Sequence, residues 1–171
     1  MKKAILIMNF VMINLVLSAN SHAFFTYKGK DHRDKECSLT IEREKTGAVV
    51  ESYVTSDMMR NTNLKYMEFL NESDSLELMD TEFGGFQKLL EASVGGNQEQ
   101  LKQIHQCMNS NNEVDDYTIS FSAKCFKGLD VAVRGHGVVM VFKKNSEKPV
   151  GISYMRSDYF GKFKPGFCII H

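Results

Sequence analysis

The sequence contains no tryptophan, only two prolines and no net charge, because 21 basic residues balance 21 acidic residues in a chain of 171. This balance excludes the strong positive field by which a protein attracts nucleic acid or an anionic membrane surface. The sequence also lacks an H-E-x-x-H zinc motif, a P-loop, a Rossmann fingerprint, an EF-hand loop and a G-x-S-x-G motif. We therefore expect no cofactor, no metal and no nucleic-acid partner.

Long hydrophobic runs are also scarce, and the one present lies at the N-terminus. Two lysines precede an apolar stretch over residues 4–19, and Ser-His-Ala ends at Ala23. This order is typical of a secretory signal peptide over residues 1–23, so it predicts export through the Sec pathway to the periplasm or the cell exterior. The apolar stretch is shorter than the roughly 18 residues of a membrane-spanning helix, and two asparagines interrupt it. No stable membrane anchor is expected after cleavage.

Cleavage would leave residues 24–171 as one domain, because no repeat, low-complexity segment or linker divides them. It removes two lysines, which leaves 19 basic against 21 acidic residues and a formal net charge of −2. The first part of this domain, residues 24–36, is rich in charge. We expect it to be a flexible lead-in.

Cysteine is sparse but even in number, and all four residues follow the predicted signal peptide: Cys37, Cys107, Cys125 and Cys168. An even set in an exported chain favours disulfides. A zinc site is disfavoured, because structural zinc sites use close pairs such as C-x-x-C and none occurs here. Three pairings are possible. We prefer Cys107–Cys125, which closes a short loop, together with Cys37–Cys168, which joins the two ends of the domain.

Hydrophobic periodicity predicts an α+β fold: an antiparallel sheet, made of an N-terminal hairpin and a C-terminal meander, with a helical pair inserted between them. Residues 37–57 alternate as a hairpin with a turn at Gly47. Apolar residues at helical spacing predict two helices, over 84–96 and 97–112, with a Gly-Gly hinge between them and Asn97 as an N-cap. Strands are expected over 116–126, 150–160 and 167–171, and residues 131–144 are expected to form one strand or a pair of short strands.

The stretch "VRGHGVVMVF" places His136 between two glycines, before a strand that is apolar on both faces. In one interpretation Gly135 and Gly137 form a bulge or tight turn and the histidine is simply exposed there. In the other, His136 is a general base oriented by Asp158. The stretch is loosely similar to the histidine strand of papain-like cysteine hydrolases. Those families place their cysteine at the N-terminus of a helix, and this sequence has no cysteine at such a position.

A second candidate site is an aromatic cluster near the C-terminus, interleaved with cations: Tyr154, Arg156, Tyr159, Phe160 and Phe163. Exposed aromatic rings beside cations can bind a peptide or a glycan. The alternative is that the same rings close one end of the sheet.

No catalytic constellation is complete in the sequence. The leading hypothesis is therefore an exported, disulfide-bonded, non-catalytic binding module whose partner is a protein, a peptide or a glycan. The alternative is an exported hydrolase that uses His136, Asp158 and an unassigned cysteine or serine nucleophile.

Overall fold

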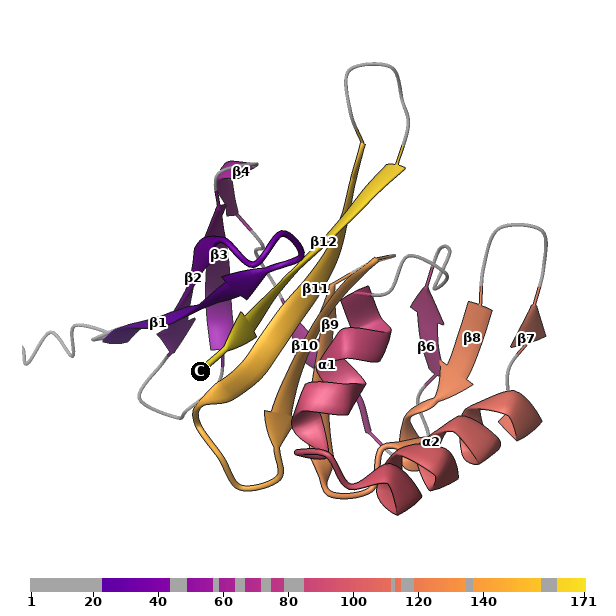
Figure 1. Cartoon of the computed structure of the whole chain (residues 1–171). Coiled ribbons are helices and arrows are strands. Elements are labelled where there is room, and N and C mark those ends of the chain that lie inside the picture. The colour runs from indigo at the N-terminus through magenta and orange to yellow at the C-terminus, as the bar shows by residue number, and fades with distance from the viewer. Residues whose placement is uncertain are drawn as a thin grey trace, which may run out of the picture.

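The computed structural model describes residues 23–43, 49–56, 59–63, 67–71, 75–78, 85–111, 113–114, 119–134, 137–157 and 163–171 (Figure 1). Within them the strands and helices run in the following order: β1 (Ala23–Asp31), β2 (Glu36–Arg43), β3 (Val49–Ser56), β4 (Met59–Asn63), β5 (Glu68–Phe69), β6 (Ser75–Leu78), α1 (Gly85–Ser93), α2 (Gln98–Asn111), β7 (Glu113–Val114), β8 (Ile119–Ser122), the 3-10 helix η2 (Ala123–Cys125), β9 (Leu129–Arg134), β10 (Val138–Lys143), β11 (Pro149–Ser157) and β12 (Phe163–Ile170).

One large antiparallel sheet dominates the described part of the chain, with the order β4-β3-β2-β1-β12-β11-β10-β9-β5. Its N-terminal half is the hairpin β2–β3 extended by β1 and β4, and its C-terminal half is the meander β9–β12. The helical pair lies between the two halves in sequence, so the predicted α+β fold is confirmed. A small second sheet, β6-β8-β7, lies beside the helices (Figure 1).

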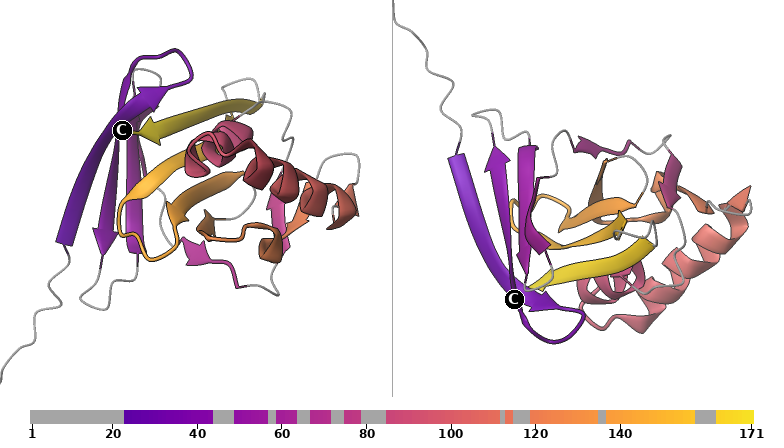
Figure 2. Two further views of the ribbon diagram at one scale, coloured as in Figure 1. Left: turned by 60° about the horizontal axis from the view of Figure 1, so that its bottom comes forward. Right: turned by 90° about the horizontal axis from the view of Figure 1, so that it is seen from above.

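The two halves of the large sheet meet at a short junction. β1 pairs with β12 through three residues only, from Gly29 opposite Ile170 to Asp31 opposite Cys168. Beyond the junction the halves diverge, which is clear when the molecule is seen from above (Figure 2). The backbones approach so closely that a Cβ atom added to Gly29 would lie 2.1 Å from the carbonyl oxygen of Ile169.

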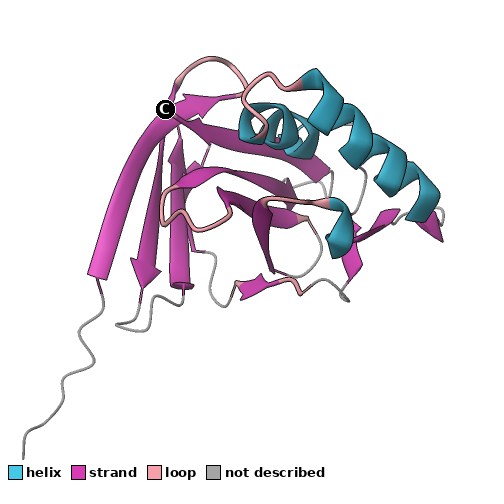
Figure 3. Cartoon of the chain, turned by 90° about the horizontal axis from the view of Figure 1, so that it is seen from below, coloured by secondary structure: helices cyan, strands magenta, loops and turns pink. Residues whose placement is uncertain are grey.

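Each face of the C-terminal half is covered by a different hydrophobic core. The strand β10 shows this best, because its side chains alternate between the two cores. Val139 and Val141 pack with α1 and α2, which lie together on one face (Figure 3). Met140 and Phe142 pack on the other face against β2 and β3 of the N-terminal half. The strand that follows His136 in sequence, which is apolar on both faces, is therefore covered on both faces.

Both helices lie within the ranges that the sequence predicts. α1 ends at Ser93 and is followed by Gly95 and Gly96, both with positive φ (58° and 84°). Asn97 then caps α2, since its side-chain oxygen accepts a hydrogen bond from the backbone N–H of Gln100 at 3.0 Å.

The expectation of a flexible lead-in over residues 24–36 is wrong. These residues form β1, a turn and the start of β2, and eight consecutive pairs join the two strands. The carboxylate of Asp31 shapes the turn, because its Oδ1 accepts hydrogen bonds from the backbone N–H groups of Arg33 (2.8 Å) and Lys35 (3.0 Å). The charged side chains that suggested disorder belong to a two-stranded ribbon with an exposed face.

Two strand boundaries also differ from prediction. The strand expected over 116–126 is described only as β8, after which the chain turns into η2 and carries Cys125 toward α2. The strand expected to begin at residue 167 begins at Phe163 and includes Pro165. Alternate residues of β12 direct their backbone groups toward β1, as His171 and Ile169 do. Pro165 belongs to this alternate set, so its nitrogen faces the same side. No described strand pairs with Pro165 on that side.

Candidate functional site

Both expected disulfides are present, and all four cysteines are paired. The bond between Cys37 and Cys168 joins β2 to β12 inside the core between the sheet halves, where the two residues are 5% and 0% exposed. The bond between Cys107 and Cys125 joins α2 to η2, and Cys107 is only half-buried.

An open pocket of about 320 Å³ lies over the second disulfide, between α2 and the segment that contains η2. The residues that line it come from both sides of the bond: Gln100, Gln103, Ile104, Gln106, Cys107, Lys124, Cys125 and Lys127. We call this the α2–η2 pocket. Its disulfide and Ile104 supply an apolar floor, and its amides and ammonium groups supply polar partners for a ligand.

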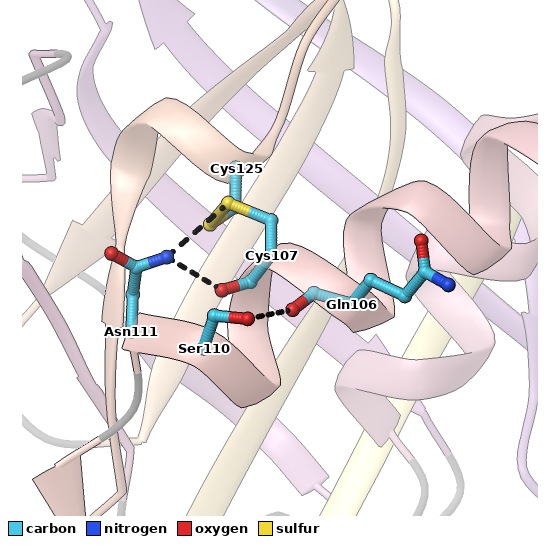
Figure 4. The surroundings of a disulfide bond; sticks show 5 residues. All are labelled: Gln106, Cys107, Ser110, Asn111 and Cys125. Carbon is cyan, nitrogen blue, oxygen red and sulfur yellow. Dashed lines mark hydrogen bonds between the residues drawn. A yellow bond between two sulfur atoms is a disulfide. The ribbon is translucent and has the colours of Figure 1, made fainter.

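One hydrogen bond joins the two walls of the α2–η2 pocket, and another contact lies within α2 beside the disulfide. Gln100 Nε2 donates to the carbonyl oxygen of Lys127 at 3.2 Å, which ties the first turn of α2 to the loop after η2. At the other end of α2, Asn111 Nδ2 donates to the carbonyl oxygen of Cys107 at 2.8 Å and lies 3.6 Å from Cys107 Sγ (Figure 4). The disulfide therefore has an amide side chain of α2 beside it.

The α2–η2 pocket is positively charged. Lys124 and Lys127 line it, whereas the described lining residues include no aspartate or glutamate. Glu99 lies next to the pocket but does not line it, and its carboxylate accepts a hydrogen bond from Nε2 of the lining residue Gln103 at 3.2 Å. Such a site favours a ligand that carries negative charge and hydrogen-bonding groups.

A second, smaller pocket of about 250 Å³ lies near the C-terminus and is lined by Ala92, Lys143, Ser146, Lys148, Pro149, Val150 and Ile170. Here one lysine is already engaged, since Lys148 Nζ donates to the backbone oxygen of His171 at 2.5 Å. This engagement makes the smaller pocket the weaker candidate.

His136 and Asp158 lie outside the described residues, so their proximity stays a prediction. The described neighbours show that Arg134 of β9 is opposite Val138 of β10, and that Gly137 has φ +89°. The chain therefore reverses direction between two short strands, which suits a glycine-rich turn. Because all four cysteines are in disulfides, the cysteine version of the hydrolase is contradicted, and only a serine nucleophile stays open.

The predicted aromatic surface is described only in part. Tyr154 is 3% exposed and packs in the core between the sheet halves, with its ring over Gly166. It therefore cannot present its ring to a ligand as expected. Arg156 and Phe163 are placed by their backbone on the neighbouring strands β11 and β12. The remaining members of the cluster, Tyr159 and Phe160, lie outside the described residues.

Sequence reasoning did not identify the lining of the α2–η2 pocket. A signal was present in the glutamines at positions 100, 103 and 106, which share one side of a helix, and in the lysines around Cys125. These residues become a site when the folded chain joins the two segments through the disulfide and the hydrogen bond from Gln100 to Lys127. His105, on the same helix, is half-buried and its Nε2 lies 2.8 Å from Gln87 Oε1 of α1, a contact between helices.

Within the described ranges, no group of three or more histidine, cysteine, aspartate or glutamate side chains could hold a metal ion. No helix in the same ranges is both long enough and apolar enough to cross a membrane. Comparison of the chain with protein-family models, with curated proteins and with solved structures finds no match.

Proposed function

We propose that this protein is a non-catalytic binding module, exported through the Sec pathway, and that the α2–η2 pocket is its ligand site. Two disulfides fit an oxidising compartment such as the periplasm or the cell exterior. The N-terminal pattern of lysines, apolar residues and Ser-His-Ala supports the same route.

The observation that carries the proposal is the composition of the α2–η2 pocket. Lys124 and Lys127 provide positive charge, glutamine amides provide both donors and acceptors, and the disulfide provides a rigid apolar floor. A ligand with carboxylate groups along a polar chain matches all three features. We therefore assign the pocket to an acidic segment of a peptide or glycan.

Rigidity supports binding rather than catalysis. The pocket walls are joined covalently by Cys107–Cys125 and by the hydrogen bond from Gln100 to Lys127. A preorganised site loses little conformational entropy when it binds a ligand. The lining residues contain no pair of nucleophile and base.

An NMR titration of the ¹⁵N-labelled mature protein tests this function, with tetraglutamate, tetragalacturonate and tetralysine as probes. Either acidic probe should shift the backbone signals of Gln103, Lys124 and Lys127, and tetralysine should not. The variant Lys124→Gln/Lys127→Gln should lose most of the response. Lys102→Gln is the matched control, because Lys102 lies on α2 outside the pocket lining and its loss should have little effect.

Two results would overturn the proposal. One is the absence of saturable shifts with both acidic probes at low ionic strength. The other is an equal loss of response in the control and in the double variant, which would show a general charge effect rather than a site.

A further inference from the structure

The strand β1 has one edge that is only partly paired. On one side it pairs with β2 along eight consecutive residues, from Ala23 to Lys30. On the other side the pairing with β12 is limited to Gly29–Asp31, extended by a hydrogen bond of 3.3 Å from His171 N–H to the carbonyl oxygen of Lys28. No described strand pairs with residues 23–27 on that side, and Figure 2 shows this end of β1 away from the C-terminal half.

The hydrogen bond from His171 identifies which backbone groups face the open side. In an antiparallel ladder, alternate residues direct both N–H and C=O to the same neighbour. Because Lys28 directs its carbonyl toward β12, Thr26 and Phe24 direct theirs to the same side. Phe25 and Tyr27 instead bond to β2. Two residues, Phe24 and Thr26, therefore offer unpaired donors and acceptors along this edge within the described structure.

The unpaired edge of β1, residues 24–27, lacks the side chains that protect a strand edge from pairing with another strand. The sequence from residue 24 to residue 27 is Phe-Phe-Thr-Tyr, without charge or proline. Phe24 is 62% exposed and Phe25 is 40% exposed. Protected edges carry lysines or prolines, and in β1 the lysines begin at Lys28, where β12 starts to cover the strand.

We propose that this edge pairs with the same edge of a second copy of the protein, so that two large sheets join through antiparallel β1 strands. Phe24 would lie opposite Thr26 of the second copy and Thr26 opposite its Phe24, which satisfies the outward N–H and C=O groups of both residues. Phe25 then lies on the two-fold axis, opposite Phe25 of the second copy.

This register is favoured over its neighbours for one reason. A shift that brings Lys28 into the pairing would compete with the hydrogen bond from His171. The register requires cleavage after Ala23, because a longer chain would continue along β1 of the second copy toward Lys28 and Gly29, which β12 already covers. The interface is small, so the association is expected to be weak and concentration-dependent.

Sedimentation velocity of the mature protein over a concentration series tests the proposal. The wild type should shift from monomer to dimer as its concentration rises. Thr26→Pro removes the outward N–H while the ladder to β2 keeps its hydrogen bonds, and this variant should stay monomeric. Thr26→Val is the matched control: it loses the hydroxyl contact with Thr40 (2.9 Å) but keeps the N–H, and it should still dimerise.

A second pair of variants decides the question if Thr26→Pro does not fold. Phe25→Lys places like charges opposite each other and should raise the dimer dissociation constant about tenfold, whereas Phe24→Lys faces Thr26 and should change it much less. A wild type that is monomeric at every concentration would overturn the proposal. Equal effects of the two lysine variants would overturn the register. Neither result bears on the α2–η2 pocket, which lies elsewhere on the molecule.

Discussion

The two disulfides lie in very different surroundings. Cys37 and Cys168 are buried between the halves of the large sheet and are separated by 131 residues in sequence. Cys107 and Cys125 are separated by 18 residues and line an open pocket. The comparison indicates that the first bond joins the two halves of the large sheet, whereas the second joins two segments at the surface.

The largest expected effect comes from removal of the buried disulfide. In the chain-entropy description a loop of this length stabilises the fold by about 5 kcal/mol, against about 3 kcal/mol for the shorter loop. Cys37→Ala/Cys168→Ala should therefore lower the free energy of unfolding more than Cys107→Ala/Cys125→Ala does. Urea denaturation of both double variants measures the difference. An equal loss, or a larger loss for the second pair, would contradict this difference between the two bonds.

The junction beside the buried disulfide should also be sensitive. A side chain at position 29 would collide with the backbone of β12, at 2.1 Å from the carbonyl oxygen of Ile169. We expect Gly29→Ala to cost about 2 kcal/mol of folding stability, as overpacked sites do. Thermal unfolding checks this value. Thr26→Ala, on the same strand but outside the junction, should cost much less, and a similar cost would rule out the junction as the cause.

A smaller effect is expected at the start of α2, which carries the pocket glutamines. Asn97→Ala removes the N-cap and should cost about 1 kcal/mol. Asn97→Asp keeps an acceptor and should restore stability. Urea denaturation measures both variants. The cap explanation fails if the aspartate variant is as unstable as the alanine variant.

The smallest effect is expected on α1, at the exposed pair Lys88–Glu91. Hydrogen bonds from Lys88, and then from Gln87, hold the pKa of Glu91 below its ordinary value. A lowered folded-state pKa adds stability above the unfolded-state pKa, and this stability is lost as the pH falls through the folded-state pKa. The pair is exposed, so the gain should be below about 0.5 kcal/mol. Glu91→Gln should lower the melting temperature slightly at pH 7 and not at pH 2. The same lowering at both pH values would contradict this cause.

The sequence predicted the parts of the fold that have strong periodicity. The hairpin β2–β3 alternates clearly, and the helical pair has apolar residues at helical spacing, two glycines and a capping asparagine. The even cysteine count predicted two disulfides and left three pairings open, and the preferred pairing is the one present. The strand β1 was missed, because a ribbon with one exposed face carries the charged residues that also mark disorder.

The pocket could not be predicted in the same way. Its walls come from α2 and from the residues around η2. The disulfide and the hydrogen bond from Gln100 to Lys127 join these walls, so that Gln103 and Lys124 line one surface. Periodicity reports which face of an element is buried, not which exposed faces meet. The sequence did not predict the start of η2 either. The alternation of apolar and polar residues in β8 continues through Ala123–Cys125, which the structure places in a 3-10 helix.

Stepwise reduction tests the difference between the two disulfides most directly. A thiol reductant should reach the half-buried Cys107 at the pocket before it reaches Cys37 and Cys168 in the core. Mild reduction of the native protein, followed by alkylation and peptide mass spectrometry, should label Cys107 and Cys125 first while circular dichroism stays unchanged. Labelling of Cys37 and Cys168 first, or of all four cysteines together, would contradict the account.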